Sequence, residues 1–228
     1  MTDLRVLEDP AGELAGMLAE AARDGRQIVL TGGSSPGTAY GMAAEREADW
    51  SSATVWFGDE RCVGPEHPDS NYGMAERVLL SRLEGAPEVM RMEGELGPDA
   101  GAGAYEALVR ERLGSEPRWD LLLLGLGPDA HCASLFPGKP AVQERSRLVA
   151  GVPVAGLEPQ VPRITMTLPC LNAAREVVFI VAGADKADAV LRAFGPEPDP
   201  GSPAAHVRPT AGSLTVLLDE AAARKLPR

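Results

Sequence analysis

Residues 28–45 have the sequence IVLTGGSSPGTAYGMAAE, in which a short apolar run is followed by a glycine- and serine-rich turn and then by a helix-forming segment. The run at 28–30 predicts a buried strand, and residues 38–45 predict a helix. Because a strand that leads through a tight turn into a helix begins a strand–helix–strand unit, this stretch indicates an α/β fold.

The same alternation continues along the chain. Further apolar runs predict strands at residues 54–57, 121–124, 177–181 and 214–218. Helices are predicted from Asp9 and Pro10 to Gly25, and at residues 71–83, 98–113, 187–194 and 220–226. The run at 121–124 is all leucine, as expected of a strand with both faces covered. We therefore predict a largely parallel, doubly covered sheet in a single domain of residues 1–228, with the proline-rich segment 195–203 as a surface loop.

Composition limits the partners of the chain. Its 228 residues include 22 Lys and Arg against 33 Asp and Glu, which gives a formal net charge of −11. Nucleic acids and anionic membrane surfaces are bound mostly through Lys and Arg, so neither is an expected partner. The first residues lack the basic and apolar regions of a signal peptide, and three widely spaced cysteines do not suggest a disulfide framework. We expect a cytoplasmic, monomeric protein that acts on a small molecule.

Polar, glycine-rich segments follow several predicted strands, where the ligand crevice of an open α/β sheet lies. In the first, Gly32 and Gly33 let backbone N–H groups approach an anion, and the start of the next helix adds positive dipole character. Ser34 and Ser35 add hydroxyl donors. A tight turn that only leads into a capped helix is the other interpretation. The segment is not a P-loop, because no Lys-Ser or Lys-Thr pair follows it.

Charged residues follow two other predicted strands. Asp59 and Arg61 come directly after the strand at 54–57, where three adjacent charges form either a solvated turn or part of a site. Lys186 lies at the head of the helix after the next-to-last predicted strand, and Arg163 is a candidate partner for it. An arginine and a lysine together suit a terminal phosphate, whereas each alone is typical of a charged surface.

The segment at residues 125–138 contains both Asp129 and His131. One of only three histidines thus lies two residues from a carboxylate, which suits general base catalysis, although a structural histidine is the alternative. The segment opens on a G-x-G-x-x-A dinucleotide motif, but its two prolines fit poorly with the regular turn and helix of that motif. We therefore expect no nucleotide cofactor.

Two further kinds of site are not expected. The cysteines and histidines lack the spacing of a zinc site, so we predict no bound metal. Neither Ser34 nor Ser134 lies in a G-x-S-x-G elbow, so we predict no serine nucleophile.

Five segments together resemble the 6-phosphogluconolactonase family: LTGGSSPGTAYGMAA, WFGDERCVGPEHPDSNYGMA, DLLLLGLGPDAHCASLFPG, VPRITMTLPCLN and VVFIVAGADKADAV. They occur in the family's order over roughly residues 28–194. The resemblance implies the fold shared with glucosamine-6-phosphate deaminases and isomerases, a modified Rossmann-like, three-layer α/β/α sandwich. It also implies hydrolysis of 6-phospho-D-glucono-1,5-lactone, a phosphorylated sugar lactone of the pentose phosphate pathway, without a cofactor.

The resemblance assigns roles to individual residues. It implies that His131 is the general base with Asp129 beside it, and that Asp59 and Arg61 line the site. The implied phosphate-binding positions are Gly32, Gly33, Ser34, Ser35, Arg163 and Lys186. Ala130 stands where the family usually has glycine, so the loop must accommodate a Cβ atom there. Ser35 replaces the commoner threonine but keeps a hydroxyl.

The expected chemistry agrees with these residues. A δ-lactone is an activated ester, so we expect His131 to deprotonate a water, and Arg61 or backbone N–H groups to stabilise the oxyanion. A sugar-phosphate isomerase or deaminase of the same fold is the nearest alternative. It would need a further acid–base carboxylate, but no Asp or Glu lies between His131 and Glu144.

A non-catalytic sugar-phosphate sensor is the second alternative. A sensor of this kind would normally be joined to a DNA-binding segment, for which we expect no room before a first strand at residue 28. The presence of both Asp129 and His131 also favours catalysis.

Overall fold

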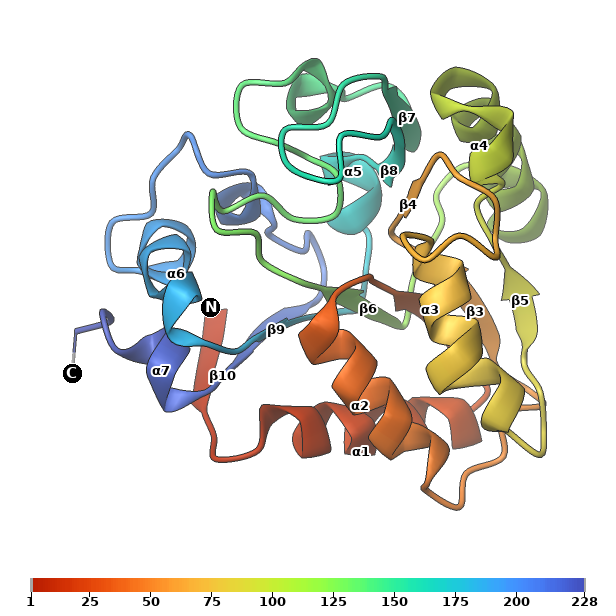
Figure 1. The fold of residues 1–228 in the computed structure, drawn as a ribbon, viewed down its shortest axis with the longest axis horizontal. Helices are drawn as coiled ribbons and strands as arrows, with labels where there is room; N and C mark the ends of the chain where they lie inside the picture. Colours follow the sequence, from red (N-terminus) through yellow and green to blue (C-terminus); the bar gives the residue numbers. More distant parts are fainter. Residues whose placement is uncertain (1, 228) are drawn as a thin grey trace.

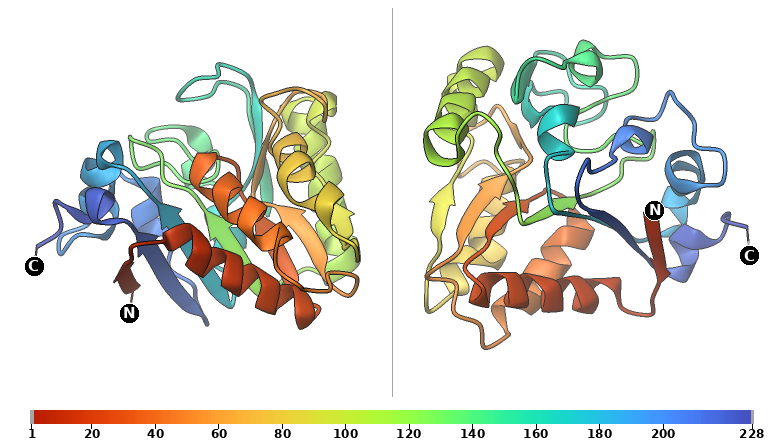
Figure 2. Two further views of the ribbon diagram at one scale, coloured as in Figure 1. Left: turned by 60° about the horizontal axis from the view of Figure 1, so that its bottom comes forward. Right: turned by 180° about the vertical axis from the view of Figure 1, so that it is seen from behind.

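The computed structural model describes residues 2–227, and its main feature is a seven-stranded sheet in which all neighbouring strands are parallel. In spatial order the strands are β1 (Thr2–Val6), β10 (Ser213–Leu218), β9 (Glu176–Val181), β6 (Leu121–Leu124), β2 (Gln27–Leu30), β3 (Thr54–Phe57) and β5 (Glu88–Met90). Helices flank the sheet on both sides (Figures 1 and 2). The predicted α/β sandwich with a mostly parallel sheet is therefore confirmed.

The helices described are α1 (Pro10–Arg23), α2 (Ser34–Ala44), α3 (Asn71–Val78), α4 (Pro98–Leu113), α5 (Leu168–Leu171), α6 (Ala187–Phe194) and α7 (Glu220–Ala223). The bounds of α1, α4 and α6 agree closely with the prediction, and α5 was not predicted. Helix α1 starts as predicted because the Asp9 carboxylate accepts a hydrogen bond from the N–H of Gly12 (2.9 Å). Just after the end of α1, Gly25 adopts the left-handed conformation (φ 65°) that is common where a helix ends. No helix within residues 2–227 is long and apolar enough to cross a membrane.

The centre of the sheet is covered on both faces. Strand β6 lies between β9 and β2, and all four of its leucines are buried, as their uninterrupted apolar run predicted. Beside it, the ring of Trp56 from β3 packs edge-on against that of Trp119, with 5.3 Å between the centroids, and both rings are buried. This packing fixes the central strands whose carboxyl ends carry the candidate site.

A second, antiparallel sheet was not predicted from the sequence. It consists of β4 (Asp59–Arg61), β8 (Arg163–Met166) and β7 (Val149–Val152), in that spatial order. The solvated turn, one of the two interpretations of residues 59–61, is excluded, because this segment continues from β3 through Gly58 and pairs with β8. Its charged residues gave no apolar signal of a strand. Asp59 and Glu60 are nevertheless buried, because each has hydrogen-bond partners.

Other element bounds also differ from the prediction. The chain begins with β1, so the first strand does not start at residue 28; most of β1 is exposed, which left no clear apolar signal. Helix α2 begins at Ser34 rather than at residue 38. The helix predicted at 71–83 is divided, since α3 is followed by a separate 3₁₀ turn at Leu80–Arg82. Residues 195–202 connect α6 to a 3₁₀ turn at Pro203–His206, consistent with a loop.

Candidate active site

A cavity of about 470 Å³ lies at the carboxyl ends of four neighbouring strands, β9, β6, β2 and β3. Its lining includes Thr31, Gly32, Gly33, Ser34, Ser35, Asp59, Arg61, Asn71, Gly127, His131, Ser134, Phe136, Leu157, Glu158, Arg163 and Lys186. Four segments that are far apart in the sequence thus converge, as the parallel arrangement predicted. Of the site residues named from the sequence, only Asp129 lies outside this lining.

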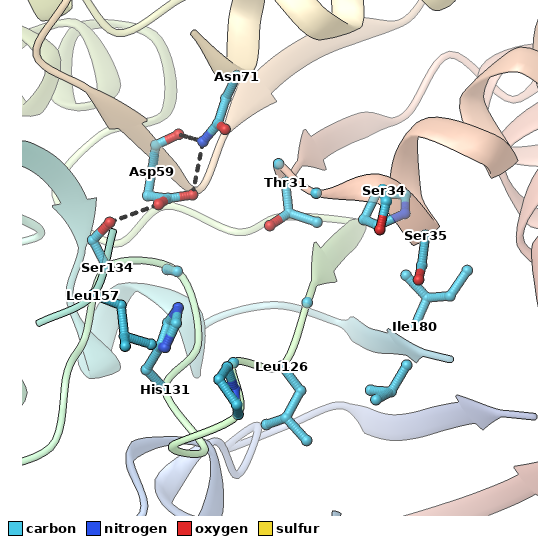
Figure 3. Close-up of a pocket in the computed structure, with 18 of the residues that line it drawn as sticks. Thr31, Ser34, Ser35, Asp59, Asn71, Leu126, His131, Ser134, Leu157 and Ile180 are labelled. Carbon is cyan, nitrogen blue, oxygen red and sulfur yellow. Dashed lines mark hydrogen bonds between the residues drawn. The ribbon is translucent and has the colours of Figure 1, made fainter. Parts of the chain in front are cut away.

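The turn after β2 places two serines at the start of a helix. Gly33 has a φ of 120°, which glycine adopts freely, and it precedes Ser34 and Ser35 in the first turn of α2. In the described part of the chain, no side chain caps this helix, so its first N–H groups and its dipole face the cavity mouth. Figure 3 shows the two serines on the opposite side of the cavity from His131.

A buried tyrosine holds the beginning of this turn. The Tyr40 hydroxyl of α2 accepts a hydrogen bond from the backbone N–H of Thr31 and donates one to the carbonyl of the same residue, both at 2.9 Å. Tyr40 is fully buried, and burial raises its pKa well above the ordinary range, so the hydroxyl keeps its proton and both bonds. The backbone that leads into Gly32 is therefore fixed.

Gly32 allows a close approach between this turn and helix α3. A Cβ atom at position 32 would overlap the side-chain oxygen of Asn71. Asn71 is the first residue of α3, and its Nδ2 donates to the backbone oxygen of Asp59 (2.8 Å) and to Oδ1 of the same residue (3.1 Å). Asn71 was not assigned to the site from the sequence, although it lies in the segment DSNYGM that carried the resemblance.

His131 and Asp129 form a hydrogen-bonded pair. Nδ1 of His131 lies 2.6 Å from Oδ1 of Asp129, which also accepts the backbone N–H of His131 at 3.1 Å. Burial acts to raise the pKa of Asp129, but the hydrogen bonds and charge of His131 outweigh it and hold this pKa below its usual value. Asp129 therefore stays ionised and lies behind the ring, whereas Nε2 has no hydrogen-bond partner among residues 2–227.

Packing fixes the orientation of the His131 ring. A Cβ atom at Gly127 would overlap this ring, so only glycine lets the backbone pass so close to it. On another side, the ring of Phe136 lies 4.6 Å from the imidazole centroid. Asp129, Gly127 and Phe136 together leave the imidazole one position in which its second nitrogen is available to a ligand in the cavity.

Asp59 is held within a buried polar network. Its Oδ2 accepts a hydrogen bond from the hydroxyl of Ser134 (2.7 Å), and its Oδ1 accepts one from Asn71. The neighbouring Glu60 accepts the backbone N–H groups of Asn71 (2.7 Å) and Tyr72 (2.8 Å) at the start of α3. Burial raises the pKa of Glu60, although these bonds oppose it. Within this motif, Asp59 and Arg61 line the cavity, whereas Glu60 binds the first N–H groups of α3.

Arg61 and Arg163 supply positive charge from the second sheet. They occupy opposed positions of β4 and β8, and both line the cavity. Arg163 is only 3% exposed, and its Nε and Nη2 donate to the carbonyls of Val161 (3.1 Å) and Pro159 (2.8 Å). Burial, followed by the charge of Arg61, lowers the pKa of Arg163. The same contacts position the loop between β7 and β8, which brings Leu157 and Glu158 to the cavity.

Lys186 completes the cationic side of the cavity. It lies in a 3₁₀ turn after β9, Ala184–Lys186, rather than in the helix itself, and its side chain is a quarter exposed. Its nearest carboxylate oxygen, Oδ2 of Asp185, is 3.8 Å away. The site therefore combines three cationic side chains, the start of a helix and a histidine, within a chain of net charge −11.

No cluster of three or more His, Cys, Asp or Glu that could hold a metal ion is found within residues 2–227. The three cysteines are unpaired thiols, and burial raises the pKa of each; for Cys62 the value is about 11. Neither fact assigns the cysteines a place in the chemistry of the cavity.

A family model described as glucosamine-6-phosphate isomerases/6-phosphogluconolactonase matches residues 5–216. The chain belongs to this family. Among its relatives, the 6-phosphogluconolactonase of Streptomyces coelicolor is 40% identical over 225 residues, which cover 92% of this chain and 85% of the relative.

Solved structures of the family have the same fold. A 6-phosphogluconolactonase from Trypanosoma brucei superimposes with a TM-score of 0.85 at 27% identity, over 100% of this chain and 99% of that one. A monomeric glucosamine-6-phosphate deaminase of the NagB superfamily has a TM-score of 0.82 at 18% identity, covering 98% of each chain. The second likeness concerns the fold alone, and it confirms the sandwich shared by lactonases and deaminases.

Proposed function

We propose that this chain hydrolyses 6-phospho-D-glucono-1,5-lactone to 6-phospho-D-gluconate in the oxidative branch of the pentose phosphate pathway. The observation that carries the proposal is the pairing of His131 with Asp129 at a cavity that Arg61, Arg163 and Lys186 also line. A base is needed at the lactone carbonyl and an anion site at the phosphate. The high coverage of the 6-phosphogluconolactonase of Streptomyces coelicolor supports the same assignment.

The reaction begins with water. Nε2 of His131 takes a proton from a water molecule whose oxygen adds to the lactone carbonyl carbon, and this forms a tetrahedral oxyanion. Asp129 holds the ring by Nδ1 and stabilises the imidazolium. Collapse of the oxyanion breaks the bond between the carbonyl carbon and the ring oxygen, which takes the proton from the imidazolium. The product is the open-chain acid, which ionises to 6-phosphogluconate.

Two groups of residues support this step. Arg61, at the cavity wall, stabilises the oxyanion by its positive charge. The phosphate is bound by Arg163, Lys186 and the N–H and hydroxyl groups of residues 32–35 at the start of α2. Binding of the phosphate places the lactone carbonyl near His131. The reaction with water is faster because the carbonyl and the base are then held in a suitable orientation.

A hydrolysis assay tests the proposal. 6-Phosphogluconolactone would be generated in place from glucose 6-phosphate, and the spontaneous rate would be subtracted. We expect the purified chain to accelerate hydrolysis, and to prefer the phosphorylated lactone to unphosphorylated gluconolactone. Hydrolysis at the spontaneous rate would contradict the proposal.

One observation keeps the isomerase or deaminase alternative open to test. The sequence places no carboxylate soon after His131, but the loop between β7 and β8 brings Glu158 to the cavity. One oxygen of Glu158 accepts the backbone N–H of Gln160 (2.9 Å), and its side chain is exposed at the cavity mouth. Incubation with glucosamine 6-phosphate would release ammonia if the chain were a deaminase, and we expect none. Cytoplasmic location and a monomeric state stay predictions from the sequence.

A further inference from the structure

The two chemical parts of the site are carried by different sheets. His131 belongs to the segment after β6 of the parallel sheet, whereas Arg61 belongs to β4 of the antiparallel sheet. In the proposed reaction, the base and the oxyanion partner act on the same lactone carbon. An error of about 1 Å in their relative position can lower a rate about 100-fold. The contacts that join these two parts therefore matter for catalysis.

Ser134 makes the hydrogen bonds that join them. Its hydroxyl donates to Oδ2 of Asp59 on β4 (2.7 Å), and its backbone N–H donates to Oγ1 of Thr165 on β8 (3.1 Å). Across residues 2–227, no other hydrogen bond connects the segment 125–138 with β4 or β8. Ser134, Asp59 and Thr165 are all buried, so water does not readily replace either bond.

The backbone beside Ser134 needs such an anchor. Ala133 has a φ of 48° and Ala130 a φ of 65°, in the left-handed region that is unfavourable for a residue with a Cβ atom. Conformations of this kind persist where the surroundings hold them. The backbone of Ala130 bonds to Gly127 (2.9 Å) and Ala204 (3.1 Å), whereas Ala133 directly precedes the two bonds of Ser134.

We propose that Ser134 is a positioning residue, which acts through Asp59 and Thr165 to set the distance between His131 and Arg61. The proposal rests on the proposed lactonase function. Both carboxylate oxygens of Asp59 already accept hydrogen bonds, from Ser134 and Asn71. Asp59 thus acts as the hydrogen-bond acceptor for Ser134 rather than as an acid or base. The hydroxyl of Ser134 directs its proton to Asp59 and carries no covalent intermediate.

Replacement of Ser134 by alanine tests this role. Ser134→Ala should lower kcat about 10- to 100-fold, because it removes the contact that positions the base. KM should change less than about threefold, because the groups proposed to bind the phosphate, at α2 and Lys186, are unchanged. Ser202→Ala is the matched control. Ser202 is also buried and donates to an aspartate, Asp199 (3.4 Å), but lies outside the cavity lining. Its kcat should stay within about twofold of wild type.

Two further variants make the result decisive. Thr165→Val nearly preserves the size of the side chain and removes the second bond, together with the bond that Oγ1 donates to the carbonyl of Met166 (3.0 Å). It should also lower kcat with KM retained, and it decides the question if Ser134→Ala fails to fold by circular dichroism. In an Asp59→Asn background, Ser134→Ala should cost much less than in wild type, because the two act as a unit.

The outcomes separate this role from the proposed function. An inactive wild-type chain would overturn both. If the wild type is active, three results would overturn the positioning role alone. Ser134→Ala and Thr165→Val could keep wild-type kcat, or their losses could appear in KM instead. The effects of the Ser134 and Asp59 substitutions on kcat could also be additive.

Discussion

Arg61 and Arg163 face each other directly across the antiparallel pair of β4 and β8, and both side chains line the cavity. Like charges at opposed positions destabilise a strand pair, and the burial of Arg163 reduces the screening between them. A phosphate bound at Arg163, as proposed, would weaken this repulsion.

The first prediction concerns this pair. 6-Phosphogluconate should raise the Tm of the wild-type chain, since a ligand at 100 times its Kd stabilises the folded state by about 2.7 kcal/mol. Arg163→Gln should reduce the shift severalfold. Arg175→Gln, at an exposed arginine outside the cavity lining, should leave it unchanged. Differential scanning fluorimetry measures all three, and an equal shift in Arg163→Gln would exclude that residue from the phosphate site.

The second prediction concerns the proposed base. His131→Ala should lower kcat about 10²- to 10⁴-fold, the usual contribution of general base catalysis. KM should change little, because the residues proposed to bind the phosphate are unchanged in this variant. The exposed His206 serves as a control, and His206→Ala should keep wild-type kcat. Near wild-type turnover by His131→Ala in the lactone assay would refute the assignment.

A third prediction follows from the close packing on the imidazole. In Gly127→Ala, the new Cβ atom must displace the His131 ring and so break its 2.6 Å contact with Asp129. We expect kcat to fall at least 10-fold, in the direction of the larger loss in His131→Ala. Gly103→Ala adds the same methyl group on α4, outside the cavity lining, where it meets no atom within 4 Å beyond its own helix, and should be nearly neutral. Equal activity of the two variants would mean that the ring tolerates the methyl group.

A fourth prediction concerns pH and stability. The pKa of Asp129 is lower in the folded protein than its ordinary value, so its pair with His131 stabilises the fold above about pH 4. This contribution is lost as the pH falls through the lower, folded-state pKa. The difference in unfolding free energy between wild type and Asp129→Asn should thus shrink as the pH falls below about 4. Denaturant titrations at several pH values below about 4 measure it, and a difference that grows as the pH falls through this range would contradict the sign.

The fifth prediction concerns the two left-handed alanines. Ala133→Gly should stabilise the chain by about 0.5–1 kcal/mol, because glycine removes the strain at a φ of 48°. Ala130→Gly should gain less, since it also gives up a fully buried methyl group worth about 0.8 kcal/mol. Thermal melts of both variants test the order. The reverse order would show that the buried methyl group of Ala130 matters less than the strain at its φ of 65°.

The strand–turn–helix pattern and the polar strand ends were readable from the sequence. Apolar runs such as residues 121–124 report burial on both faces, and parallel strands bring their carboxyl ends to one edge. From these two facts alone, Gly32, Asp59, His131 and Lys186 could be expected to meet, and they line one cavity.

The second sheet and the polar network needed the tertiary structure. Residues 59–61 carry three charges, and no local rule predicts that such a segment is buried as a strand. Their burial depends on partners from distant segments, among them Asn71 and Ser134, and such pairing leaves no periodic signal. The sequence by itself indicated most of the chemical groups of the site, because hydrophobic runs mark where each strand ends and parallel strands bring those ends to one edge. Only the tertiary structure decided how Asp129, Ser134 and the opposed arginines hold those groups, because hydrogen-bond geometry between distant segments is set by packing.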